Sequence, residues 1–363
     1  MRKNLVLAVL LCSAALPQTA EKLAGGPYVV NVTGRSATVM WVIETGEAAL
    51  GTDPAQLTRK APSLRAEKIS YTGLQPGQTY HYQILGREDG RGRFKTAPAK
   101  AEPFSFIVYG DTRTRHDFHR KVMEAMAAET PDLLLHTGDL VADGADTAQW
   151  PIFFSIEREL LRKAAFFPVL GNHERNNPQY HQFFDVQFPY YSFDWANAHF
   201  TILNSDLGNA VRTREEREEF WSRQLHWLDG DLERSRKADF RFVVFHHPPY
   251  TAVKSRQGGN RDVQRIIPLL EKHKVTSVFN GHDHNYQHHF KNGVHYIVTG
   301  GGGAPLYPVD GAMEGITLKV ERTEHFVRVK VDGQTARSEA VALDGRIIDA
   351  VEMTASVPLP TGQ

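Results

Sequence analysis

Five short polar clusters contain residue types that bind metal ions. They are GDTR with Asp111 and Arg113, GDL with Asp139, GNHE with Asn172, His173 and Glu174, HHPPY with His246 and His247, and GHDH with His282, Asp283 and His284. Carboxylates, an amide oxygen and imidazoles, with no thiolate, indicate a site for Zn, Fe or Mn rather than a structural zinc site made of thiolates. The clusters together therefore predict a metal centre.

The spacing of the clusters predicts that they meet at one edge of a sheet. Asp111 and Asp139 are 28 residues apart, and Asp139 and Asn172 are 33 residues apart, about one strand–helix–strand unit each. Open α/β folds bind ligands beyond the carboxyl ends of their strands, so we expect all five clusters on the same rim. A single Gly-Asp pair or a single pair of histidines is more often a turn or a helix cap. The prediction therefore depends on all five occurring together.

The segments between the clusters predict an α/β layered domain. Apolar runs typical of buried strands occupy residues 104–109, 132–136, 165–170, 199–204, 240–245, 275–280 and 295–300. Helix-like segments lie between several of them, at Arg120–Glu129, Glu215–Arg236 and Arg261–Lys272. Helices that alternate with strands indicate sheets covered by helices. The alternating tail after residue 315 is expected to extend one sheet edge.

Residues 22–99 show short strands and turn residues without a helical period. SATVMWVIE alternates in the manner of a strand with one face on a sandwich core. Tyr80 and Tyr82 follow a Pro-Gly turn and resemble the tyrosine corner of immunoglobulin-like sandwiches. We predict a fibronectin type III-like β-sandwich over 22–99, a proline-bearing linker near 96–103 and a second domain over 103–357.

Residues 1–20 have the layout of a secretory signal peptide, with two cations before an apolar run from Leu5 to Leu11. The run is shorter than the roughly 20 residues that span a bilayer. The only cysteine, Cys12, lies in this segment, and the bulky Leu11 before it disfavours a lipid-anchored cysteine. We expect a secreted or periplasmic protein without a disulfide or an integral membrane span.

Composition excludes several classes of protein. Apolar residues make up 41% and charged residues 23% of the chain, which is not the composition of a disordered, collagen-like or polytopic membrane protein. The 42 basic and 42 acidic residues give a formal net charge of zero. This balance provides no long-range field toward nucleic acid, and no nucleic-acid partner is predicted.

Residues Pro27 to Thr354 resemble the calcineurin-like metallophosphoesterase superfamily, in its purple acid phosphatase branch. The five clusters carry the resemblance, with QLHWLDGDL, NGHDHNYQ and GGGGAPLY in support. The resemblance implies an αββα sandwich holding two metal ions, which would be Mn, Zn or Fe. It assigns Asp111 and His284 to the first metal, Asp139 to both, and Asn172, His246 and His282 to the second.

The resemblance also implies a reaction. Two ions that share a carboxylate lower the pKa of a bound water, and the resulting hydroxide attacks phosphorus in line. His173 would face the phosphoryl group or protonate the leaving oxygen, and Glu174 would orient His173. The expected activity is hydrolysis of phosphate esters, with monoesters favoured and a phosphodiesterase as the alternative. A degenerate domain that binds a phosphorylated ligand without turnover is the other alternative.

Two residues depart from the family pattern. Ala142 stands where purple acid phosphatases have the tyrosine that gives their colour, and Arg113 stands where many relatives have a metal-binding histidine. We therefore predict a colourless protein whose first metal site is weaker or more open. Arg113 is interpreted either as an ion-pair partner of an acid or, preferably, as a clamp for substrate phosphate.

Three other histidines lie near the predicted clusters in the sequence. His119 is a candidate substrate contact, although a histidine at a helix start is more often a cap or solvated. His136 is either a partner that orients a ligand or a core residue. His247 is expected to point away from His246, by strand alternation.

Overall fold

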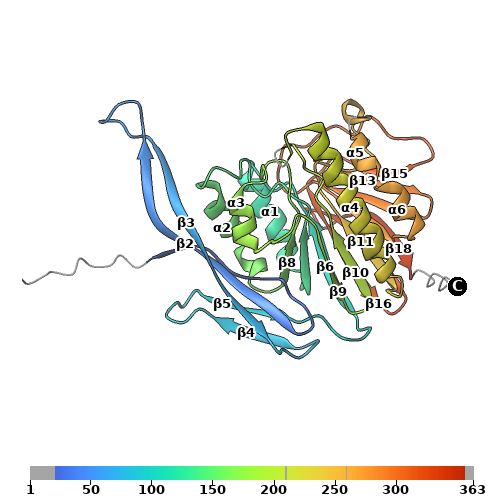
Figure 1. Cartoon of the computed structure of the whole chain (residues 1–363), viewed down its shortest axis with the longest axis horizontal. Helices are drawn as coiled ribbons and strands as arrows, with labels where there is room; N and C mark the ends of the chain where they lie inside the picture. The colour runs from blue at the N-terminus through green and yellow to red at the C-terminus, as the bar shows by residue number, and fades with distance from the viewer. Residues whose placement is uncertain (1–20, 209–210, 259, 356–363) are drawn as a thin grey trace, which may run out of the picture.

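The computed structural model describes residues 21–208, 211–258 and 260–355. Two sheets pack face to face, and helices cover the outer face of each, so the molecule has four layers (Figure 1). The mixed α/β fold class predicted from the sequence is confirmed. The predicted signal peptide at residues 1–20 lies outside the described residues.

The first sheet has the strand order β18-β17-β16-β6-β7-β8-β1-β2-β3. Its strands β6, β7 and β8 run parallel, and β16 adds to β6 in the antiparallel direction. The bounds are β1 Lys22–Val30, β2 Ser36–Leu50, β3 Arg59–Thr72, β6 Phe104–Tyr109, β7 Leu133–His136, β8 Ala165–Pro168, β16 His325–Asp332, β17 Thr335–Ala342 and β18 Ile347–Thr354.

The second sheet has the order β15-β13-β14-β12-β11-β10-β9, with β10, β11, β12 and β14 parallel. The bounds are β9 Tyr191–Trp195, β10 Ala198–Ile202, β11 Phe240–Val244, β12 Ser277–Asn280, β13 Tyr286–Lys291, β14 Val294–Thr299 and β15 Thr317–Glu321. A separate hairpin pairs β4 Thr79–Gln83 with β5 Arg91–Lys95. Parallel strands in both sheets bring many carboxyl ends to one rim, as the cluster spacing predicts.

The helices lie on the outer faces. α1 His116–Ala127, α2 Gln149–Leu161 and α3 Pro178–Phe184 contribute to the apolar cluster on the first sheet; α4 Arg214–Arg234, α5 Arg261–Gln264 and α6 Ile267–Lys272 contribute to the one on the second. A short 3-10 helix covers Lys254–Arg256. The helix predicted over 261–272 is divided, because Pro268 has no N–H to donate to the carbonyl of Gln264. Among the described residues, no helix is long and apolar enough to cross a membrane.

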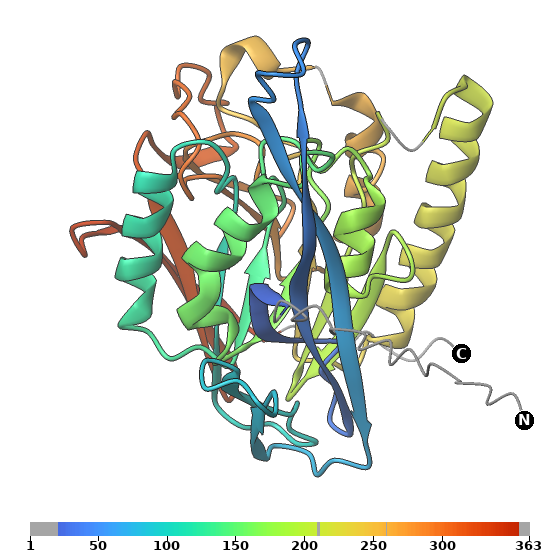
Figure 2. The same ribbon diagram turned by 90° about the vertical axis from the view of Figure 1, so that its left-hand side faces the viewer.

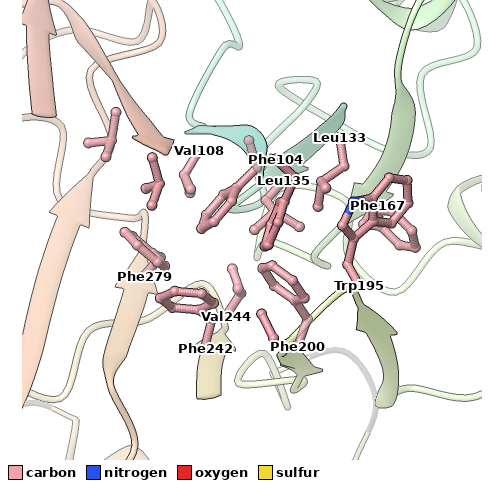
Figure 3. Packing of buried hydrophobic residues seen from close by; sticks show 14 of the residues in the cluster. Phe104, Val108, Leu133, Leu135, Phe167, Trp195, Phe200, Phe242, Val244 and Phe279 are labelled. Carbon is pink, nitrogen blue, oxygen red and sulfur yellow. The ribbon is translucent and has the colours of Figure 1, made fainter. Parts of the chain in front are cut away.

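Aromatic rings from both sheets form the core between them (Figure 3). The ring centroid of Phe106 on β6 lies 5.2 Å from those of Phe200 on β10 and Phe242 on β11. The alternate residues Ile107 and Tyr109 belong to the cluster under the helices. Both faces of the central strands are therefore buried, which holds the strand ends at the rim in place.

The N-terminal strands differ from the prediction, and a self-contained fibronectin type III-like domain is not confirmed. β1 pairs with β8 and β2, so β1, β2 and β3 continue the first sheet. The alternation in β2 has two apolar faces: Val39 packs between the sheets, while Met40 packs under the helices. The β2–β3 ribbon crosses in front of the α2 and α3 layer (Figure 2), and its tip projects away from the body (Figure 1). Only the local tyrosine contact matches, with the Gln75 N–H donating to Tyr80 Oη at 2.9 Å.

Candidate metal centre

The predicted ligands follow the carboxyl ends of five strands on the same rim. Asp111 comes after β6, Asp139 after β7, Asn172 after β8, His246 after β11 and His282 after β12. Three of these residues have a positive φ: 57° at Asp111, 59° at Asp139 and 67° at His282. The chain thus turns sharply at the strand end and presents each side chain above the sheet.

One group of ligand atoms is tightly convergent. Asn172 Oδ1 lies 3.1 Å from His246 Nε2 and 3.0 Å from His282 Nδ1, and the two ring nitrogens are 3.3 Å apart. Asp139 Oδ1 lies 3.4 Å from His246 Nε2. Ligand atoms bound tetrahedrally to zinc at ordinary bond lengths are about 3.4 Å from one another. These four residues therefore fit a metal ion. We call this group the second position, because the family resemblance assigns these residues to the second metal.

The ring tautomer of His246 supports this assignment. His246 Nδ1 donates to the carbonyl of Thr137 at 2.8 Å, so Nε2 is the ring nitrogen that points at the other ligands. Burial lowers the pKa of His246, but the charges of Asp139 and Asp111 raise it above its ordinary value overall. Burial and the neighbouring His247 hold the pKa of His282 well below its ordinary value. Neutral His282 has a free nitrogen for a cation.

A second group of ligand atoms surrounds Arg113. Asp111 Oδ1 lies 3.3 Å from His284 Nε2. Arg113 Nε donates to Asp139 Oδ2 at 3.2 Å, and Arg113 Nη2 lies 3.4 Å from His284 Nε2. We call this group the first position. The ion-pair interpretation of Arg113 is thus observed, with Asp139 as the acid.

The carboxylate of Asp139 lies between the two positions, where the family resemblance would have it bridge two ions. Its Oδ1 faces His246 and its Oδ2 faces Arg113. Burial raises its pKa, but His246, His173 and Arg113 together lower the pKa below the ordinary value. Asp139 is therefore ionised and available to a cation.

His173 stands at the open side of this cluster. Its side chain is 29% exposed, and its Nε2 lies 3.8 Å from Asp139 Oδ2. Its Nδ1 is 2.7 Å from the carbonyl of Ala142, so Nδ1 carries the proton that is donated there. Nε2 thus points to the region that a substrate would enter.

Glu174 has a different structural role from the one predicted. It is fully buried, and the residue that orients the His173 ring is Ala142, through its carbonyl. The Glu174 carboxylate accepts from the backbone N–H groups of Gly171, Asp139, Leu140 and Val141 at 2.8–3.3 Å. Burial, with the nearby Asp139, raises the pKa of Glu174 to about 8. Glu174 holds together the two loops that carry Asp139 and Asn172.

The structure does not bring His119 to the metal-binding side chains. His119 is buried on α1, with its Nε2 2.8 Å from Glu157 Oε1 and its ring against Phe153. The helical periodicity of α1 turns this side chain toward α2. His136 is the neighbour that supports the site, because the N–H of Gly138 donates to its Nδ1 at 3.2 Å.

The prediction for His247 was wrong. Its ring centroid lies 4.2 Å from that of His282, and His246, His247 and His282 form a group able to hold a metal. Because β11 ends at Val244, strand alternation no longer applies at position 247. A cavity of about 350 Å³ opens beside these rings and is lined by His247, Pro248, Thr251, Ser255, Arg256, Asn260, His282 and Asp283. The signal in the sequence was the second histidine of HHPPY.

Known proteins share this fold. Purple acid phosphatase PPD1 from yellow lupin superposes with a TM-score of 0.69 at 17% identity, over 90% of this chain and 74% of that one. The structure of PhoD superposes with a TM-score of 0.65 at 14% identity, over 94% and 90%. At these identities the likeness shows the fold alone.

Sequence relatives match shorter stretches. Purple acid phosphatase 7 of Arabidopsis thaliana is 39% identical over 92 residues, 25% of this chain and 27% of that protein. An uncharacterised protein of Mycobacterium tuberculosis, Rv2577, is 24% identical over 274 residues, 62% and 50% of the two chains. The chain thus spans half or less of the length of these relatives. The calcineurin-like phosphoesterase family model matches residues 104–286, half of the chain and all five clusters, and the chain therefore belongs to this family.

Proposed function

We propose that this protein hydrolyses phosphate monoesters in a metal-dependent reaction at the cluster of predicted ligands on the rim of the sheets. The observation that carries the proposal is the convergence of Asp139, Asn172, His246 and His282 at 3.0–3.4 Å beside the exposed ring of His173. Membership of the phosphoesterase family supports the reaction class.

The residues of the second position would hold a Mn, Zn or Fe ion. Such an ion, when bound, supplies Lewis acidity to a phosphoryl oxygen and lowers the pKa of water. His173 holds a proton on Nδ1 and directs Nε2 at the open side, where it contacts the phosphoryl group or the leaving oxygen. Arg113, whose side chain is 13% exposed, contributes a fixed positive charge next to the same region.

The cavity beside His282 supports a substrate in which a small group is esterified to the phosphate. Its lining combines Arg256 and Asn260 with His247. Arg256 also pairs with Asp283 at 3.0 Å, so its charge is partly balanced before a substrate enters. We favour a monoester because its dianionic phosphoryl group gains most from the cationic surroundings. A phosphodiesterase on the same site is the alternative.

The test is hydrolysis of matched aryl phosphate mono- and diesters by protein reconstituted with Mn, Zn or Fe. We expect faster turnover of the monoester, and we expect Asp139→Asn to abolish turnover because both positions lose their shared carboxylate. Asp332→Asn, at an exposed site at the end of β16, is the control and should keep full activity. Faster diester turnover would select the phosphodiesterase. Metal-loaded protein that cleaves neither ester would instead support the phospho-ligand-binding alternative.

We also propose export from the cytoplasm, supported by the charged and apolar pattern of residues 1–20. Expression of the full chain followed by N-terminal sequencing tests this. We expect a mature start within residues 16–21 in the exported fraction. An unprocessed chain that stays in the cytoplasm would contradict the proposal.

A further inference from the structure

The guanidinium of Arg113 lies among the ligand atoms of the first position. Its Nε is 3.2 Å from Asp139 Oδ2 and its Nη2 is 3.4 Å from His284 Nε2. These are two of the three atoms that the family pattern assigns to the first metal, and the third is on Asp111. A cation already belonging to the chain therefore occupies the place expected for an ion.

His284 and Asp111 need a cation between them. His284 Nδ1 donates to the carbonyl of Pro305 at 2.7 Å, which directs its Nε2 toward Arg113 and Asp111. Asp111 Oδ1 lies 3.3 Å from that nitrogen, is buried, and has no hydrogen-bond partner among the described residues. A buried carboxylate oxygen without a hydrogen-bond partner needs positive charge nearby. Arg113 provides this charge.

The local backbone holds Arg113 in this place. Asp111 and Thr114, on either side, have φ of 57° and 73°, and the carbonyl of Arg113 accepts from the Arg115 N–H at 3.1 Å. Tyr307 stacks on the His284 ring with centroids 4.0 Å apart, which holds this ring in place next to Arg113. The Arg113 side chain is only 13% exposed, so the guanidinium lies within the centre rather than in solvent.

The first position also has fewer ligands than the second. Its protein ligand atoms come from Asp111, Asp139 and His284, and Ala142 has no side-chain oxygen to add. The Ala142 carbonyl already accepts from His173. A divalent ion there would meet the guanidinium at close range, and both would compete for Asp139 Oδ2. The residues of the first position therefore do not fit a metal ion while Arg113 is present.

We propose that Arg113 replaces the first metal, and that this phosphoesterase centre binds a single metal ion at the second position. The inference deepens the proposed function and rests on it only for the identity of the reaction. It replaces the expectation of two ions that the family resemblance implied.

The test is metal content, measured by mass spectrometry after equilibration with Mn²⁺ and dialysis, with electron paramagnetic resonance of the same samples. We expect one Mn per chain and the spectrum of an isolated ion. Two Mn per chain with an exchange-coupled spectrum would overturn the inference and leave the proposed hydrolysis intact. One Mn without hydrolysis would overturn the proposed function and leave the inference intact. Protein that binds no Mn would overturn both.

Two alanine variants distinguish the positions. His282→Ala should lose the ion, because His282 belongs to the second position. His284→Ala should keep one ion, because His284 faces Arg113 rather than a metal. A His284→Ala variant that loses an ion relative to the unaltered protein would overturn the inference. Each of these two variants is compared only with the unaltered protein, so the comparison does not depend on whether other variants fold.

Replacement of Arg113 should allow a second metal ion to bind. Arg113→His removes the competing cation and supplies a neutral imidazole, so we expect two Mn per chain and the appearance of an exchange-coupled spectrum. Arg115→His is the matched control in the same loop, since Arg115 pairs with Glu324 at 2.6 Å, and it should keep one ion. A folded Arg113→His variant that still binds one ion would overturn the assignment of Arg113 as the excluding group.

Discussion

The carboxylate of Glu174 accepts a hydrogen bond from the backbone N–H of Asp139 at 2.9 Å and another from Gly171 at 2.8 Å. These contacts join the loop after β7 to the loop after β8. Gly171 allows this approach, since a Cβ on it would lie 2.2 Å from the Asp139 nitrogen. The geometry of the centre thus depends on the buried Glu174, although Glu174 is not itself one of the predicted metal ligands.

Glu174→Gln should destabilise the protein and weaken metal binding. A glutamine places an NH₂ group against two backbone donors, leaving buried N–H groups unpaired at a cost of about 2–4 kcal/mol. Urea unfolding of metal-free protein and Mn²⁺ titration measure the two effects. Glu159→Gln, on an exposed position of α2, is the control. Unchanged stability in Glu174→Gln would contradict the structural role assigned here.

His173→Ala should lower kcat by about 10²–10⁴-fold while metal content stays the same. His173 presents its Nε2 to the open side and does not belong to the convergent ligands. Steady-state kinetics and metal analysis of the same samples separate catalysis from binding. His226→Ala, at an exposed position of α4, should change neither. Loss of metal together with activity would identify His173 as a ligand.

Acid should destabilise the metal-free protein through buried neutral histidines. Burial lowers the pKa of His325 from its ordinary value of 6.5 to about 4. The stability that this neutral ring provides is fully present above pH 6.5 and is lost as pH falls toward 4, by up to about 3 kcal/mol. Urea unfolding between pH 7 and 4 measures the loss.

His325→Phe should make this pH dependence shallower, because phenylalanine does not titrate and can keep the edge contact with Tyr286. His81→Phe, on the outer hairpin strand β4, is the comparison variant and should leave the slope unchanged. An equally steep slope in His325→Phe and in the unaltered protein would exclude His325 as a source of acid lability.

A chain that begins at Glu102 should fail to fold on its own. β1 lies between β8 and β2, and the Tyr28 ring stacks on Phe154 with centroids 5.2 Å apart. Removal of the N-terminal strands would expose the edge of β8 and an apolar face under α2. Soluble expression, circular dichroism and dye binding test this. A soluble monomer with native metal affinity would instead support the separate domain at 103–357 predicted from the sequence.

Much of the centre could be predicted from local sequence. Each polar cluster follows an apolar run, and the ends of parallel strands meet at one rim, so Asp111, Asp139, Asn172, His246 and His282 were predictable as neighbours. Apolar periodicity likewise predicts the strands and most helices, because burial of one or both faces is a local property of the pattern. These predictions required no knowledge of which distant side chains touch.

Only the tertiary structure decided the contacts between the clusters. Arg113 could have faced solvent or substrate, but the 3.2 Å contact with Asp139, 26 residues later, places it at the first position. Glu174 accepts from the loop after β7 rather than orienting His173. β1 joins β8 through Val29 and Ala165, which lie far apart in the chain. Such choices depend on packing and charge balance among residues far apart in the chain, and no local period or motif records them.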